Sequence, residues 1–205
     1  MSDSRPDRWY LSCMAPNTKG DKFAWLDPSS LYINAKIFHA LLDDLVKPFK
    51  SDDIDVVGGL DAMGFVLATG IATRLGKGML PIRKAGKIPL NTDSVEFTNY
   101  SGRTQDMEIR KPAFAPGTRV LLVDQWVETS GTMGGAIKLV ERQQGIVAGI
   151  AAVCIEENEK TLWLYEKYKC VSAVIPGSAI QDQCNRKTLN SFKNYKPELV
   201  FPAKR

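Results

Sequence analysis

Cysteine and histidine are scarce in this sequence, and neither forms a recognisable motif. The 205 residues include four cysteines and one histidine, His39. The cysteines lie far apart without a C-x-x-C pair, which argues against a disulfide framework. We therefore expect reduced thiols, mostly in the core, and a structural histidine near the apolar side of a helix. The cysteines are Cys13, Cys154, Cys170 and Cys184.

The sequence also lacks an apolar segment long enough to cross a bilayer. Its longest apolar run, Ile146–Ile155, falls well short of the roughly 20 residues that a span requires. The first residues, MSDSRPDRWYLSCMAPN, carry charges of both signs and no continuous apolar stretch, unlike a secretory signal. These absences predict a cytoplasmic protein without a membrane partner.

The chain as a whole has only a small excess of positive charge. The formal net charge is +4 and the pI is about 8.8. This balance favours an anionic ligand, but it falls short of the basic stripe that binds nucleic acid, so we expect no nucleic-acid partner. Because a domain averages roughly 150 residues, we expect residues 1–205 to form one domain.

Hydrophobic spacing predicts alternating helices and strands. Residues 31–49 have the pattern of one amphipathic helix. A short aliphatic run, Ile54–Val57, then leads through a glycine turn at Gly58–Gly64 into a helix that stops at Gly76. The apolar stripe of the first helix consists of Ile33, Ile37, Leu41, Leu45 and Phe49.

The pattern continues through the second half of the chain. Gly78–Lys84 is a predicted strand, and the connection at residues 86–102 is so long and polar that we expect a functional loop. Strands at DMEIRK and RVLLVD follow, then a helix over residues 133–144 and a strand over residues 146–155. The alternation implies an α/β fold with a mostly parallel sheet and helices on both faces. Ligands then bind beyond the carboxyl ends of the strands.

The segment VLLVDQWVETSGT carries the strongest signal for a site. Its last four residues lie where a helix begins, so unpaired N–H groups and the helix dipole favour an anion such as phosphate. Asp124, at the strand end, is placed to accept hydrogen bonds from sugar hydroxyls, and Glu128 adds a second carboxylate. The alternative is that a hydroxyl side chain of this loop only caps the helix. The loop consists of Thr129, Ser130, Gly131 and Thr132.

The same segment resembles the phosphoribosyl diphosphate binding motif of type I phosphoribosyltransferases, which has four hydrophobic residues, two acids and a Thr-Gly-Gly-Thr-like loop. Residues 59–89 and 107–120 are similar to adenine phosphoribosyltransferases, and the resemblance covers residues 23–174. It implies displacement of pyrophosphate from phosphoribosyl diphosphate by a purine base, adenine by the nearest resemblance. It also implies Mg²⁺ as the cofactor and a homodimer.

The resemblance implies a fold and a role for each matching segment. Residues 1–50 would form an N-terminal helix and a small hood, residues 51–175 the core, and residues 176–205 a C-terminal tail. The Thr129–Thr132 loop would hold the 5′-phosphate and Asp124 the ribose hydroxyls. The loop at residues 86–102 would close over the site. The residues implied at the pyrophosphate are Leu60, Asp61, Ala62, Met63, Arg83, Lys84 and Lys87. The candidates for stacking on the base are Trp25 and Phe23.

Three features depart from the family pattern. Gln125 stands in the place of the second acid, and Met63 stands where adenine phosphoribosyltransferases commonly have an arginine. The loop SVEFTNYSG does not align with the family's Glu-Tyr-Gly, which leaves Glu96, Tyr100 and Glu128 as candidates for proton transfer. The departures keep a second hypothesis open, a catalytically silent relative that binds phosphoribosyl diphosphate or a nucleotide as a regulator.

Overall fold

A computed structural model describes residues 7–19, 23–186 and 190, and its centre is a seven-stranded sheet. The strands are β3 (Val56–Leu60), β4 (Gly78–Lys84), β5 (Thr92–Thr98), β6 (Thr104–Arg110), β7 (Arg119–Val127), β8 (Ile146–Ile155) and β9 (Cys170–Ser172). Their order is β5-β6-β4-β3-β7-β8-β9. Strands β4, β3, β7, β8 and β9 are parallel, whereas β6 is antiparallel to both of its neighbours. The predicted α/β fold with a mostly parallel sheet is confirmed.

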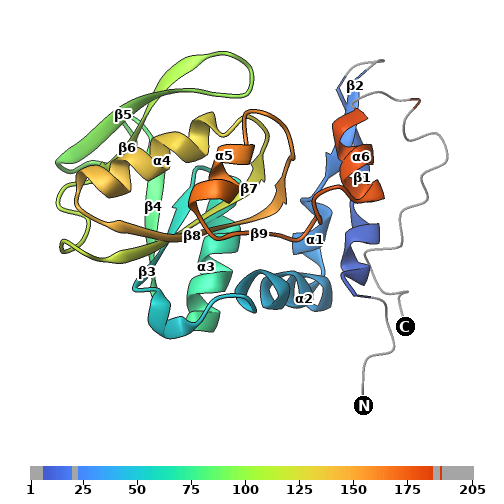
Figure 1. The fold of residues 1–205 in the computed structure, drawn as a ribbon, viewed down its shortest axis with the longest axis horizontal. Helices are drawn as coiled ribbons and strands as arrows, with labels where there is room; N and C mark the ends of the chain where they lie inside the picture. The colour runs from blue at the N-terminus through green and yellow to red at the C-terminus, as the bar shows by residue number, and fades with distance from the viewer. Residues whose placement is uncertain (1–6, 20–22, 187–189, 191–205) are drawn as a thin grey trace.

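Helices cover both faces of this sheet, as Figure 1 shows. They are α1 (Ser30–Ile33), α2 (Ala35–Val46), α3 (Met63–Leu75), α4 (Gly131–Arg142), α5 (Leu162–Lys167) and α6 (Ala179–Arg186), with 3₁₀ turns η1 (Trp9–Cys13) and η2 (Ser51–Asp53). Alternate side chains of β7 point to opposite faces. Leu121 and Val123 therefore join the core under α2 and α3, whereas Val120 and Leu122 join the core under α4.

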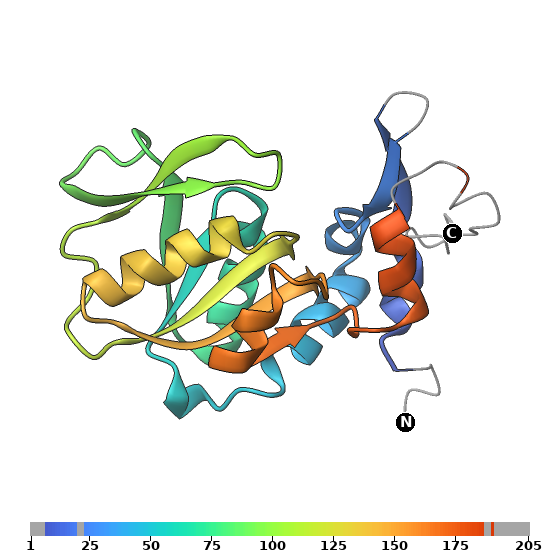
Figure 2. The same cartoon turned by 45° about the horizontal axis from the view of Figure 1, so that its top comes forward.

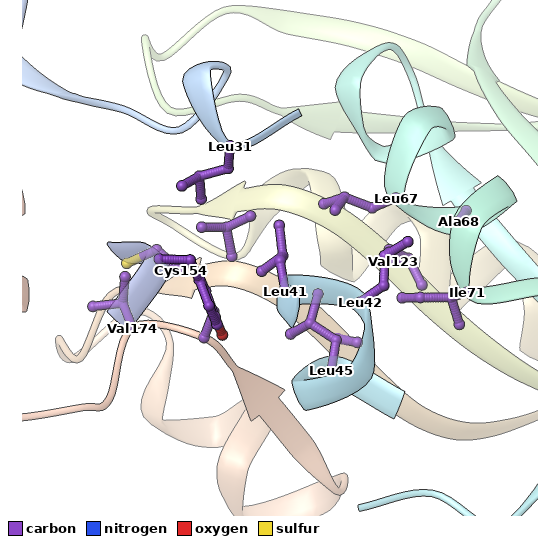
Figure 3. Packing of buried hydrophobic residues seen from close by; sticks show 14 of the residues in the cluster. Leu31, Leu41, Leu42, Leu45, Leu67, Ala68, Ile71, Val123, Cys154 and Val174 are labelled. Atoms are coloured by element: carbon purple, nitrogen blue, oxygen red, sulfur yellow. The ribbon is translucent and has the colours of Figure 1, made fainter. Parts of the chain in front are cut away.

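The core under α2 and α3 is built largely from leucine, as Figure 3 shows. The two helices pack closely, because a Cβ added at Gly70 of α3 would lie 2.6 Å from Leu42 Cδ1. Val123 extends this core into β7, directly before the predicted site residue Asp124. Buried members include Leu41, Leu42, Leu45, Leu67, Ala68 and Ile71.

The predicted helix over residues 31–49 is two helices, so this prediction was wrong in its continuity. Asn34 has an extended backbone, with φ −101° and ψ 119°, and its side chain accepts hydrogen bonds from the N–H groups of Lys36 and Ile37. This cap begins α2 as a new helix, so that the residues of α1 do not continue the predicted stripe. Ile33 is consequently 59% exposed, and His39, expected near the apolar side, is exposed as well.

Two predicted turns lie partly within strands. Gly58 and Gly59, expected in a turn, belong to β3, where a Cβ at Gly59 would lie 2.7 Å from the Ala68 Cβ of α3. Gly59 therefore permits close packing of α3 on β3. Strand β7 runs on to Val127, because β8 is long enough to pair with it as far as Ile155. Asp124 consequently lies inside β7 and not at its end.

The predicted loop at residues 86–102 contains strand β5, which pairs with β6 along its whole length. The inward positions of β5 include Phe97 and Asp93, which are 8% and 6% exposed. A carboxylate in an inward position hides the alternation that would predict a strand. Arg142 of α4 compensates the buried charge, with its Nη2 2.5 Å from Asp93 Oδ1.

The N-terminal region forms a separate hairpin of β1 (Ala15–Lys19) and β2 (Phe23–Asp27). Figures 1 and 2 both show this hairpin beside α6, at one end of the molecule and apart from the seven-stranded sheet. No helix in the described part of the chain has the length and apolar character to cross a membrane. The predicted tail lies largely outside the described residues, which end at Arg186 apart from Asn190.

Alanine substitutions at two residues of the predicted stripe should distinguish the two observed helices from the single predicted helix. Leu45 is fully buried, so Leu45→Ala should lower the free energy of unfolding by about 2–5 kcal/mol. Ile33 is 59% exposed, so Ile33→Ala should change it by less than about 0.5 kcal/mol. Urea unfolding measures both. Equal losses in the free energy of unfolding would instead support the single continuous helix.

Candidate active site

The site lies where β3 and β7 end side by side. The two strands are parallel and in register, with Gly59 opposite Val123. Helix α3 begins just beyond β3 and α4 just beyond β7, so both turns reach the same edge of the sheet. A Cβ at Gly64 would lie 2.6 Å from Val123 O and 3.2 Å from the Cα of Asp124. The first turn of α3 therefore packs directly against the backbone at Asp124.

Asp124 is a partly buried acid at the centre of this edge. Its Oδ1 accepts a hydrogen bond of 2.7 Å from the N–H of Gln125. Burial raises the pKa of Asp124 to about 7, because the hydrogen bond from Gln125 offsets only part of the cost of desolvating the charge. The carboxyl can therefore change its protonation state near neutral pH.

Gln125, the residue in place of the second acid, contacts the N-terminal region. Its Nε2 donates a hydrogen bond of 2.8 Å to the hydroxyl oxygen of Tyr32 in α1. Burial and the nearby charge of Asp124 raise the pKa of Tyr32, so this phenol stays neutral. Sequence reasoning missed Tyr32 because nothing near α1 matches a motif.

The loop before α4 does not have the conformation of a simple helix cap. Ser130 precedes the helix with φ 58° and ψ −2°, and its side chain makes no capping hydrogen bond. Its hydroxyl donates to Lys160 O at 2.6 Å and accepts from Trp163 Nε1 at 2.9 Å. The capping alternative therefore fails for Ser130. The same geometry turns its hydroxyl away from the role of phosphate donor that the sequence suggested.

The end of β5 lies against this loop. A Cβ added at Gly131 would come within 1.9 Å of the carbonyl oxygen of Thr98. Only glycine fits at that position, since the neighbouring atom belongs to the backbone. The segment predicted to cover the site thus has one end seated on the first residue of α4.

The basic residues beyond β4 surround the turn that follows β3. Asp61 of that turn accepts a hydrogen bond from the Lys84 N–H at 3.4 Å, and Arg83 Nε lies 3.8 Å from its Oδ2. Arg83 also donates from Nη1 to the carbonyl oxygen of Lys87 at 3.1 Å. The structure therefore places the Arg83 side chain and the Lys84 backbone against Asp61, and the Lys87 backbone against Arg83.

A buried glutamate, Glu108 of β6, fixes the turn that carries Lys87. Its Oε1 accepts hydrogen bonds of 2.8 Å from the N–H groups of both Lys87 and Ile88. Burial alone would raise the pKa of Glu108, but these bonds hold it below the ordinary value. The sequence gives no signal for this residue, because Glu108 alternates with the core residues Met107 and Ile109 of β6 and so lies on the opposite face of the strand.

The predicted pyrophosphate turn itself is only partly exposed. Leu60 is 1% exposed and packs in the core, so it could offer a ligand only its backbone. Ala62 and Met63 are exposed at the start of α3, where Met63 leaves the helix terminus without the arginine common in the family. The turn is thus open to an anion through its backbone.

Other candidates lie apart from these residues. Trp25 belongs to β2, in register with Asn17 of β1, on the hairpin that Figure 2 shows away from the sheet. Glu96 is exposed on β5 and Tyr100 is 69% exposed in the turn after it. Glu128 is the candidate proton-transfer residue next to the loop. Within the described residues, no cluster of three or more His, Cys, Asp or Glu forms a ready metal site.

Comparison with known proteins identifies the family of this arrangement. The family model for the phosphoribosyl transferase domain matches residues 29–184. Adenine phosphoribosyltransferase of Bradyrhizobium sp. (strain ORS 278) is 41% identical over 128 residues, which cover 62% of this chain and 69% of the relative. The Chloroflexus aurantiacus enzyme of the same name is 39% identical over 127 residues, covering 62% of this chain and 73% of its own.

Solved structures give the same result. Adenine phosphoribosyltransferase of Thermoanaerobacter pseudethanolicus superposes with a TM-score of 0.70 at 29% identity, covering 80% of this chain and 95% of that one. The Giardia lamblia enzyme, solved in complex with 9-deazaadenine, gives a TM-score of 0.75 at 25% identity, covering 85% of this chain and 99% of its own. Both likenesses extend well beyond the loop before α4.

The environment of Asp124 should make stability depend on pH. Its pKa of about 7 in the folded protein exceeds the value of about 4 in an unfolded chain, so the folded state binds the proton more tightly. The resulting stabilisation is complete below about pH 4 and is lost as the pH rises to about 7. Asparagine does not titrate. The free energy of unfolding of the wild type should therefore fall, relative to Asp124→Asn, by up to about 4 kcal/mol between these limits. Urea unfolding of both proteins tests this, and parallel pH curves would refute it.

Proposed function

The chain belongs to the phosphoribosyl transferase family, and we propose that it transfers the 5-phosphoribosyl group from phosphoribosyl diphosphate to adenine, with release of pyrophosphate. The observation that carries the proposal is the partly exposed start of α4, left uncapped by the Ser130 side chain and set beyond Asp124 and beside the turn after β3. The names of the relatives support adenine as the acceptor.

The 5′-phosphate would bind at the loop Thr129–Thr132. The N–H groups at the start of α4 and the helix dipole both favour an anion there. Because the Ser130 hydroxyl is engaged by Lys160 and Trp163, Ser130 would contribute its backbone N–H. Thr129 and Thr132, both partly exposed, would add hydroxyl donors.

The ribose would lie over Asp124. A carboxylate there can accept hydrogen bonds from two neighbouring hydroxyls, and the adjoining turn of α3 keeps it in place. Gln125 supplies no second charge, and its amide is bound to Tyr32. The departure from the family pattern therefore removes a charge but ties α1 to the strand that carries Asp124.

The pyrophosphate would leave along the turn Leu60–Met63. Backbone N–H groups of the turn would hold it, and Arg83, Lys84 and Lys87 would balance its charge. Glu108 keeps the Lys87 turn in position through its two backbone hydrogen bonds. Asp61 already holds the Arg83 side chain and the N–H of Lys84 against the turn. A bound anion would compete with the Asp61 carboxylate for these groups.

Mg²⁺ suits this donor set, since it is commonly held by one or two carboxylates together with substrate phosphates. Asp124 would provide a protein carboxylate, and the ion would supply charge neutralisation to the departing pyrophosphate. The chain's own contribution is to position the reactants and to balance the charge that develops between ribose and pyrophosphate. Glu128 would transfer the proton of the purine nitrogen that bonds to the ribose. The segment of residues 86–102 would exclude water from the site.

The remaining parts of the proposal rest on the family resemblance and on the sequence. Trp25 would stack on the base, which requires the β1–β2 hairpin to reach the site. The protein would act as a homodimer in the cytoplasm. The alternative of a silent binding protein receives no support from the relatives, whose names are those of enzymes.

Pyrophosphate release tests the function directly. We expect release from phosphoribosyl diphosphate with Mg²⁺ and adenine, and little with hypoxanthine, guanine, xanthine, uracil or orotate, with AMP as the product. Asp124→Asn, measured at the same pH, should reduce the use of phosphoribosyl diphosphate strongly. Binding of phosphoribosyl diphosphate without release for any base would contradict the transferase and restore the silent alternative.

Glu128 is expected to act in the chemical step. Glu128→Gln should lower kcat by about a hundredfold or more and change the affinity for adenine much less. Glu159→Gln serves as the control, because Glu159 is an exposed glutamate in the turn facing the same loop. A loss confined to KM would remove Glu128 from proton transfer.

A further inference from the structure

We infer that Trp163 is a positioning residue for the phosphate loop, because its indole N–H and the Lys160 carbonyl hold Ser130 in a left-handed conformation. The inference rests on the proposed function, since it concerns how that loop comes to fit a phosphate. The sequence assigns Trp163 no role, and the catalytic scheme above does not use it.

The backbone of Ser130 has an uncommon conformation. Its φ of 58° lies in the left-handed region, which a residue with a Cβ rarely adopts and which glycine adopts at little cost. Ser130 lies immediately before Gly131, the first residue of α4. Its backbone angles therefore set the direction in which the first N–H groups of α4 point.

The side chain of Ser130 is fully engaged in holding that conformation. It donates one hydrogen bond to Lys160 O at 2.6 Å and accepts one from Trp163 Nε1 at 2.9 Å. A serine hydroxyl has a single proton to donate, and with that proton given to Lys160 O it cannot also donate to a phosphate oxygen. Held in this way, the hydroxyl favours one backbone conformation for the residue that carries it.

The turn that supplies these partners grips the loop at a second point. Asn158 Nδ2 donates to Glu128 O at 2.9 Å, and Asn158 Oδ1 accepts from the Lys160 N–H at 2.9 Å. The turn between β8 and α5 thus contacts the residues on both sides of Thr129. The turn therefore holds the loop in place at two points.

Trp163 is itself fixed by α4 and α5. A Cβ at Gly134 would lie 3.7 Å from its ring, and Lys167 Nζ lies 5.7 Å from the ring centroid. The indole therefore spans from α5 to the first turns of α4, with its N–H directed at Ser130. Loss of the N–H alone should loosen the loop without disturbing this packing.

A double-mutant cycle separates positioning from packing. Trp163→Phe keeps an aromatic ring but removes the donor, and it should weaken binding of ribose 5-phosphate, measured by calorimetry, by about threefold to tenfold. KM for phosphoribosyl diphosphate should rise similarly while kcat stays within about twofold. Ser130→Gly removes the hydroxyl that the indole contacts, while glycine adopts the left-handed conformation unaided, so the affinity of this variant is the reference for the second step of the cycle. Adding Trp163→Phe to Ser130→Gly should then cost nothing further.

Trp9→Phe is the matched control, the same chemical change in η1, and it should leave binding unchanged. Thermal unfolding of every variant confirms that the comparison is between folded proteins. Equal losses from Trp163→Phe in the wild type and in the Ser130→Gly variant would show a packing role and overturn the inference, as would no loss in either. Failure of the wild type to bind ribose 5-phosphate at all would instead overturn the proposed function, and the inference with it.

Discussion

The parallel pairing of β3 with β7 is the constraint on which the site depends. With Gly59 opposite Val123, the two strands deliver their following turns to one edge of the sheet, and Gly64 lets α3 settle against Asp124. Phosphoribosyl diphosphate, the proposed substrate, has charge at both ends, and this edge offers a helix start to one end and a turn beside Arg83 to the other. The start of α4 and the turn after β3 can act on one ligand only because the register of β3 and β7 brings them to the same edge.

The residues that hold the site in shape come from outside its motifs. Tyr32 binds the amide of Gln125, Glu108 binds the turn of Lys87, and Trp163 binds Ser130. Each of these lies in a segment remote in sequence from the residue it supports. Gln125, which stands in place of the second acid of the motif, thus has a partner from another element in the Tyr32 hydroxyl.

Much of this arrangement could be predicted from the sequence, and the errors have physical causes. The bounds of β4 and β8 were predicted as observed, because continuous apolar runs between glycines and polar turns are unambiguous. Strand β5 was missed because Asp93 points inward, where its pairing with Arg142 replaces the apolar contact that a pattern search expects. The break at Asn34 and the orientation of Ser130 depend on hydrogen bonds that spacing alone does not reveal. Sequence reasoning predicted a phosphate site at the loop before α4 but did not identify the residues that contact this loop.

The loop before α4 is the part of the site on which the proposed function rests, because we propose that it binds the 5′-phosphate. Titration of ¹⁵N-labelled protein with ribose 5-phosphate, followed by amide resonances, tests this role without requiring turnover. We expect large, saturable shifts at Thr129, Ser130, Gly131 and Thr132, with smaller ones at Asp124 and little change along the β1–β2 hairpin. Saturable shifts elsewhere, with these four amides unmoved, would show that the phosphate binds at another place.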